Sequence, residues 1–179
     1  MKELIKIAIT GPESTGKSLL AAGLAKHFNT VFVPEFARTY IDRLTRPYEQ
    51  ADLKVIAKGQ LSAEAKAQKN ASDFLFCDTE MLVMKIWSLH KYGNCDPFIL
   101  HAINNQKFDL YLLCNIDLPW EYDRQREHPQ LRQYFFNCYQ QELKNNAFRY
   151  AVVSGQGEKR LQCAIEAVEL ISKLADQSL

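Results

Sequence analysis

Residues 11–18 read Gly-Pro-Glu-Ser-Thr-Gly-Lys-Ser, which matches the pattern Gly-x-x-x-x-Gly-Lys-[Ser/Thr] without a gap. An apolar run of strand length at 4–9 precedes the match, and apolar residues at helical spacing follow it. This strand–loop–helix context suits a phosphate-binding loop, because the free N–H groups at a helix start can surround an anion. The pattern therefore predicts an α/β fold of the P-loop NTPase class that binds a nucleoside triphosphate.

Residue types within the loop have separate chemical roles. Glycine permits the tight turn around phosphate, Lys17 supplies a positive charge for the β- and γ-phosphates, and the Ser18 hydroxyl can bind Mg²⁺. We expect the nucleotide to contact Gly11, Pro12, Glu13, Ser14, Thr15, Gly16, Lys17, Ser18 and Leu19. Asp78 ends a later apolar run, where it can hold the same Mg²⁺, cap the following helix, or do both.

Five apolar runs alternate with helical patterns along the chain. Strands are expected at about 4–9, 31–33, 74–77, 110–114 and 150–153, and helices at about 17–28, 36–44, 49–70, 79–91, 97–105, 131–145 and around 161–171. Such alternation predicts a five-stranded parallel sheet with helices on both faces and ligands at the carboxyl ends of the strands. We expect one kinase domain over residues 1–179, with a polar lid at about 117–132 after strand four.

Composition narrows the functional classes. A net charge of +1 gives no reason to expect a nucleic-acid partner, and no apolar run is long enough to cross a membrane. The five cysteines are scattered without Cys-x-x-Cys spacing, which argues against zinc and against a disulfide framework. The first residues do not read as a signal peptide, so we expect a cytoplasmic protein.

Glu35 and Arg38 follow the short second strand and are the candidates for acceptor chemistry. A carboxylate at this strand end would face the γ-phosphate, where it could align a hydroxyl nucleophile and accept its proton. Arg38 could steady Glu35 or touch the transferred phosphoryl group. The alternative is an ordinary surface ion pair at i, i+3 spacing.

The lid segment carries three arginines, Arg124, Arg126 and Arg132, of which we take Arg126 as the first candidate for closing over the phosphoryl group. The alternative is a solvated helix of mixed charge. Trp120 is the lid's candidate platform for a flat ring. Trp87 lies on an apolar helical face, so its side chain either packs in the core or stacks on the substrate.

Several short segments together are more specific than the loop alone. Besides the loop, they are Pro-Glu-Phe-Ala-Arg at 34–38, Ile-Ala-Lys-Gly-Gln at 56–60, Cys-Asp-Thr at 77–79, Pro-Trp-Glu at 119–121 and Arg-Glu-His-Pro at 126–129. Over about residues 4–170 the chain resembles the ribosylnicotinamide kinase domain of bacterial NAD-biosynthesis regulators.

The resemblance implies transfer of the γ-phosphoryl group of ATP, with Mg²⁺, to the 5′-hydroxyl of nicotinamide riboside. It implies that carboxylates such as Glu35 and Asp123 hold the neutral ribose, and that an aromatic face receives the cationic pyridinium ring. Two alternatives stay open: another nucleoside or small-metabolite kinase, and a nucleotide-dependent switch. A guanine-specific switch needs Asn-Lys-x-Asp after a strand, whereas residues 115–117 read Asn-Ile-Asp.

Overall fold

Parallel strands form the centre of the computed structural model, which describes residues 3–177. Within those residues the strands are β1 (Ile5–Thr10), β2 (Phe32–Val33), β3 (Phe74–Asp78), β4 (Leu110–Cys114) and β5 (Tyr150–Val153). They form one five-stranded sheet in the order β2-β3-β1-β4-β5, and every neighbouring pair is parallel. The predicted five-stranded parallel sheet is confirmed.

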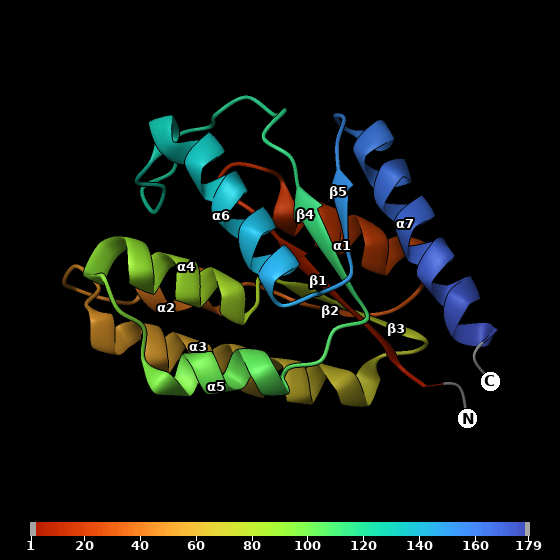
Figure 1. Cartoon of the computed structure of the whole chain (residues 1–179), viewed down its shortest axis with the longest axis horizontal. Helices are drawn as coiled ribbons and strands as arrows, with labels where there is room; N and C mark the ends of the chain where they lie inside the picture. Colours follow the sequence, from red (N-terminus) through yellow and green to blue (C-terminus); the bar gives the residue numbers. More distant parts are fainter. Residues whose placement is uncertain (1–2, 178–179) are drawn as a thin grey trace.

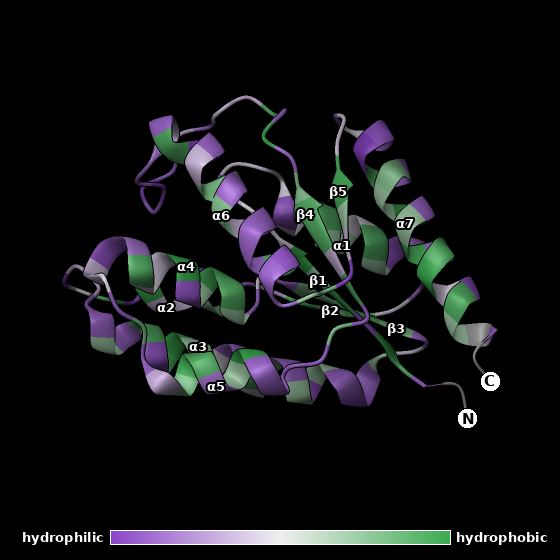
Figure 2. Ribbon diagram, in the orientation of Figure 1, coloured by the Kyte–Doolittle hydropathy of each residue, from purple (hydrophilic) through white to green (hydrophobic). Residues whose placement is uncertain are grey.

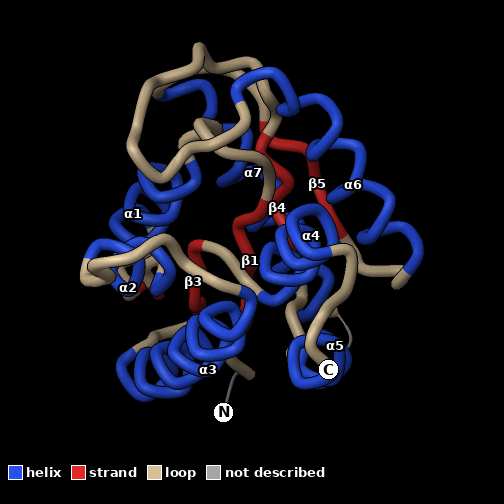
Figure 3. Tube along the Cα trace, turned by 90° about the vertical axis from the view of Figure 1, so that its left-hand side faces the viewer, coloured by secondary structure: helices blue, strands red, loops and turns tan. Residues whose placement is uncertain are grey.

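Helices cover both faces of this sheet. They are α1 (Lys17–His27), α2 (Phe36–Asp42), α3 (Gln50–Ala67), α4 (Met81–Tyr92), α5 (Pro97–Asn105), α6 (Arg132–Asn145) and α7 (Glu158–Asp176). Helices α1 and α7 pack on one face, and α3 to α6 lie on the other (Figure 1). Figure 3 shows the strands running between α1 on one side and α4 and α6 on the other.

Burial on both sides explains why the strands read as continuous apolar runs. In β1, Ile5, Ile7 and Ile9 pack against α1 and α7, whereas Ala8 packs against the opposite helices. The strands are mostly hydrophobic, and the helices carry their hydrophilic residues away from the sheet (Figure 2). A central strand buried on two faces fixes the position of the loop that follows it.

One predicted boundary was wrong in a way that bears on function. Helix α4 begins at Met81, and its N-cap is Glu80, whose side chain accepts a hydrogen bond from the Leu82 N–H. Asp78 therefore does not cap this helix, because it is the last residue of β3. Thr79, with φ of 69°, turns the chain between strand and helix. The carboxylate of Asp78 is consequently free of any capping role.

Residues 117–131, which we call the lid, connect β4 to α6. Apart from a short 3₁₀ turn at Pro129–Leu131, the lid has no regular secondary structure, as the polar composition indicated. Among residues 3–177, no helix combines the length and the apolar character that a membrane span requires.

Candidate active site

A cavity of about 250 Å³ opens at the carboxyl end of the sheet. The phosphate loop forms one wall, side chains from α2, α3, α4 and α6 form others, and the lid covers part of the opening. Ligands of open parallel sheets bind at this end of the strands. The volume and the converging polar groups make this cavity the candidate active site.

The phosphate loop has the backbone that the sequence predicts. Gly11 has φ of 130°, and a Cβ there would lie 2.9 Å from the Cys114 carbonyl oxygen, so a side chain would force β1 and β4 apart. Gly16, with φ of 74°, is the N-cap of α1 and aims the helix start at the cavity. Lys17 Nζ donates a 2.7 Å hydrogen bond to the Pro12 carbonyl, which holds the ammonium over the loop.

Glu35 lies between β2 and α2 and lines the cavity together with Lys17. It occupies the N-cap position of α2 in extended backbone, but its carboxylate accepts no capping hydrogen bond. Burial raises the pKa of Glu35, and the positive charge of Lys17 offsets part of that rise. A carboxylate with a raised pKa is a stronger base for a hydroxyl proton.

Asp78 has a buried carboxylate oxygen of the kind that can bind a cation. The residue is 1% exposed, and its Oδ1 atom has no hydrogen-bond partner among the described residues. Burial raises the pKa of this carboxyl, while Ser18 and Lys17 lower it. A buried oxygen without a partner beside a hydroxyl fits a hard oxygen-preferring cation such as Mg²⁺.

The structure separates the three arginines of the predicted lid, of which Arg132 is the first residue of α6. Arg126 lines the cavity, and its Nη1 donates to the Glu121 carbonyl at 2.6 Å and to Ser14 Oγ at 3.3 Å. Arg132 donates to the carbonyl oxygens of Leu118 and Ser14 at 2.9 and 3.1 Å, so it ties the lid to the phosphate loop. Arg124 pairs with Asp42 on the outer surface.

Arg38 and Asp123 join α2 to the lid. Arg38 Nη1 donates to Asp123 Oδ2 at 2.8 Å, so the ion pair that Arg38 forms reaches across the cavity mouth. The backbone N–H of Gln125 is the main cause that lowers the pKa of Asp123, and the bond from Arg38 lowers it further. Trp120 is half-buried in the lid but is not among the described residues that line the cavity.

An aromatic wall faces the phosphate loop. Trp87 is half-buried, lines the cavity and stacks on His128 and Phe135, with ring centroids 5.5 and 5.3 Å away. It therefore both packs against the core and presents its indole to the cavity. Tyr48 and Tyr139 also line the cavity, and the sequence reasoning missed both. Tyr139 lies on the apolar face of α6, so the sequence pattern marks it as a core residue.

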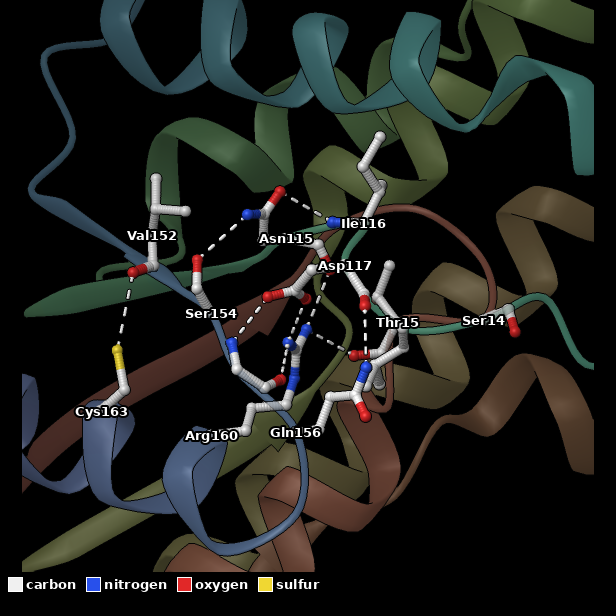
Figure 4. A network of polar contacts seen from close by, with 12 residues as sticks. Ser14, Thr15, Asn115, Ile116, Asp117, Val152, Ser154, Gln156, Arg160 and Cys163 are labelled. Carbon is white, nitrogen blue, oxygen red and sulfur yellow. Dashed lines mark hydrogen bonds and ion pairs between the residues drawn. The ribbon is translucent and has the colours of Figure 1, made fainter.

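Arg160 is a third residue that the sequence did not predict for the site. It is 4% exposed and donates to the carbonyl oxygens of Thr15, Asn115 and Gly155 at 2.8, 3.0 and 3.0 Å and to Asp117 Oδ1 at 2.7 Å. Figure 4 shows the guanidinium between the phosphate loop and the loops after β4 and β5. Arg160 lies in the first turn of α7, directly after the loop that follows β5. That position was the available signal, because the loop lies at the carboxyl end of the sheet.

Comparison with known sequences identifies relatives. Residues 6–160 match a family described as AAA domain. The chain is 31% identical over 155 residues to the trifunctional NAD biosynthesis/regulator protein NadR of Salmonella typhimurium, covering 82% of this chain and 37% of that protein. It is 32% identical over 123 residues to the Escherichia coli NadR, covering 65% of this chain and 30% of that protein. The chain thus spans about a third of the length of these curated relatives.

Solved structures show the same fold. A crystal structure of NadR in complex with NR superposes with a TM-score of 0.83 at 20% identity, covering 94% of this chain and 51% of that one. A deoxyadenosine kinase from M. mycoides gives 0.60 at 18% identity, covering 94% and 100%. The resemblance to the kinase domain of NAD-biosynthesis regulators is confirmed. Because the family match spans most of its length, the chain belongs to the AAA domain family.

Proposed function

We propose that the chain transfers the γ-phosphoryl group of ATP to the 5′-hydroxyl of nicotinamide riboside and forms nicotinamide mononucleotide. One observation carries the proposal: Lys17, Glu35 and Arg126 line a single cavity that also has an aromatic wall. A nucleotide-dependent switch needs no carboxylate with a raised pKa opposite its phosphate loop. The NadR relatives and the crystal structure of NadR in complex with NR support the choice of acceptor.

In the proposed reaction each residue has a separate role. The phosphate loop and Lys17 hold the ATP phosphates, and Arg126 stabilises the charge that spreads over the transferred group. Glu35 aligns the 5′-hydroxyl and accepts its proton. A bond forms between the acceptor oxygen and the γ-phosphorus, the bond from that phosphorus to the ADP oxygen breaks, and the proton leaves on Glu35.

Mg²⁺ would be held by Ser18 and Asp78 and would neutralise charge on the phosphates. The buried, unpartnered Asp78 oxygen supports this choice of ligand. Asp123 is our candidate for accepting hydrogen bonds from the ribose hydroxyls, which requires that its bond to Arg38 opens. Trp87 is our candidate platform for the pyridinium ring, since cations are attracted to aromatic faces. Trp120 would need a lid movement to reach the cavity.

The test is ATP turnover measured against a panel of nucleosides that includes nicotinamide riboside. We expect turnover to require an acceptor, with nicotinamide riboside giving the highest kcat/KM. A higher value for a deoxynucleoside would identify another nucleoside kinase. ATP hydrolysis that no acceptor stimulates would support the switch instead.

Glu35→Gln is the variant that tests the base. It retains the size of the side chain but cannot take the proton, so we expect kcat to fall roughly 10²–10⁴-fold with near-normal ATP affinity. Lys17→Ala is the matched control, because it should abolish transfer through the donor site instead. Near-parental kcat in Glu35→Gln would contradict the assignment of the base.

A further inference from the structure

Gln60 on α3 contacts the two segments that carry Glu35 and Asp78. Its Oε1 accepts a 2.8 Å hydrogen bond from the Phe36 N–H, and its Nε2 donates to the Asp78 carbonyl oxygen at 3.4 Å. The side chain is buried, with 3% of the residue exposed. A buried carboxamide is costly unless both of its ends are paired, and here both are.

The contact with Phe36 satisfies one of the free N–H groups at the start of α2. Phe36 is the first residue of α2, and an N–H at a helix start needs an acceptor from outside the helix. Glu35 stands in the N-cap position, where its own side chain could cap the helix, but it makes no such bond. Gln60 supplies the acceptor for Phe36 from a different helix, and the carboxylate of Glu35, which makes no capping bond, lines the cavity.

Gly59 explains how α3 comes close enough. A Cβ at Gly59 would lie 2.2 Å from Cε1 of the Phe36 ring, so the ring rests directly on the α3 backbone. Phe36 is itself packed against Tyr40, with ring centroids 6.2 Å apart. The neighbouring Gln60 then reaches the start of α2. This packing explains the Gly-Gln pair at the end of the segment 56–60.

We propose that Gln60 is a positioning residue whose carboxamide fixes the start of α2 to the end of β3 and so sets the placement of Glu35 relative to Asp78. The assignment rests on the proposed kinase activity, because it concerns the alignment of the acceptor base with the metal-ligand candidate. Gln60 does not itself line the cavity. Its effect should therefore appear in the alignment of the reacting groups and not in nucleotide binding.

Gln60→Leu tests this, because leucine fills the space but makes neither bond. A misplacement on the order of 1 Å at a reacting group costs roughly 10²-fold, so we expect kcat to fall about 10–100-fold while KM for ATP changes less than about twofold. The acidic limb of the pH profile of kcat should also move, since the surroundings of Glu35 change.

Gln106→Leu is the matched control. Gln106 is also buried and also bridges two elements, but it accepts from Met81 N and donates to Glu64, with no contact to the start of α2. It should lower thermal stability and leave the acidic limb in place. A shift of equal size in both variants would mean that Gln60 only supports the fold.

Gln60→Glu covers the case in which Gln60→Leu does not fold. It retains the length and the acceptor for Phe36, and it adds a negative charge near Glu35 and Asp78. That charge should move the acidic limb upward, because a nearby like charge raises the pKa of a carboxyl. An unmoved limb in this folded variant would overturn the proposal.

The parent protein separates the two possible failures. If the parent shows no acceptor-dependent turnover, the proposed function is wrong and the assignment of Gln60 falls with it. If the parent turns over and Gln60→Leu retains the parental kcat, only the assignment of Gln60 is wrong.

Discussion

The buried residues beneath the cavity, which we call the floor and which include Gln60, Asp78 and Glu80, are held in a different way from the lid. In the floor, buried side chains bridge backbone and side-chain partners, as Gln60 and Glu80 do. In the lid, the outer contacts are exposed ion pairs, with Arg124 and Asp42 69% and 43% exposed. A buried polar group left without its partner is costly, whereas an exposed pair contributes little and is screened by salt. The comparison implies a fixed floor and a lid whose outer edge is held weakly, whereas Arg126 and Arg132 hold its inner edge to Ser14.

Asp78→Asn tests the floor and should have the largest effect. It removes the charge and retains the shape, so we expect kcat to fall on the order of 10²-fold and the Mg²⁺ requirement to rise. Steady-state kinetics over an Mg²⁺ titration measure both quantities, with circular dichroism as the check on folding. An unchanged titration would move the metal ligand elsewhere.

Arg126→Lys tests the lid where it meets the phosphate loop. Lysine retains the charge but loses the planar fork, so we expect kcat to fall about 10-fold or more with a smaller change in KM. Arg124→Lys is the control on the outer surface, where kcat should stay near the parental value. Equal losses in the two variants would show that the lid acts as a charged surface and not through Arg126.

Glu80→Gln measures how much the burial of a negative charge in the floor lowers the free energy of unfolding. Burial is the main cause that raises the pKa of Glu80 to about 7. The folded protein thus holds this proton more tightly than the unfolded chain does, so stability is full below the usual glutamate range and falls as pH rises through about 7.

We therefore expect Glu80→Gln to raise the free energy of unfolding at pH 8 by about 1–2 kcal/mol, with no gain at pH 4. The two carboxylate oxygens have separate partners, so in glutamine Oε1 would accept from Leu82 N and Nε2 would donate to the Thr10 hydroxyl, which can reverse its role. Urea denaturation in metal-free buffer at the two pH values measures the difference. A gain of the same size at both values would rule out a charge effect.

Arg124→Ala should have the smallest effect. Its ion pair with Asp42 is largely exposed, so we expect KM for the acceptor to change less than about threefold at low salt. Steady-state kinetics at low and high ionic strength provide the measurement, and the difference should vanish at high salt. A loss that survives high salt would show that the lid is held more firmly than this comparison says.

Local patterns were sufficient for the elements of the fold. The predicted ranges 97–105, 110–114 and 150–153 coincide with α5, β4 and β5, because apolar periodicity and chain punctuation act over a few residues. The phosphate loop was also readable, since its chemistry resides in eight consecutive residues. Because ligands of parallel sheets bind at the carboxyl ends of the strands, the sequence also predicts Glu35 and Asp78 as site residues.

Tertiary structure alone decided which distant groups meet. Arg126 and Ser14 are 112 residues apart, and Arg160 and Thr15 are 145 apart, so no local pattern could pair them. The sequence did not order the strands, give the partners of Arg124, Arg126 and Arg132, or show that Gln60 bonds to both α2 and β3. Packing determines these contacts, because both faces of the sheet must be buried at once, and that requirement involves the whole chain.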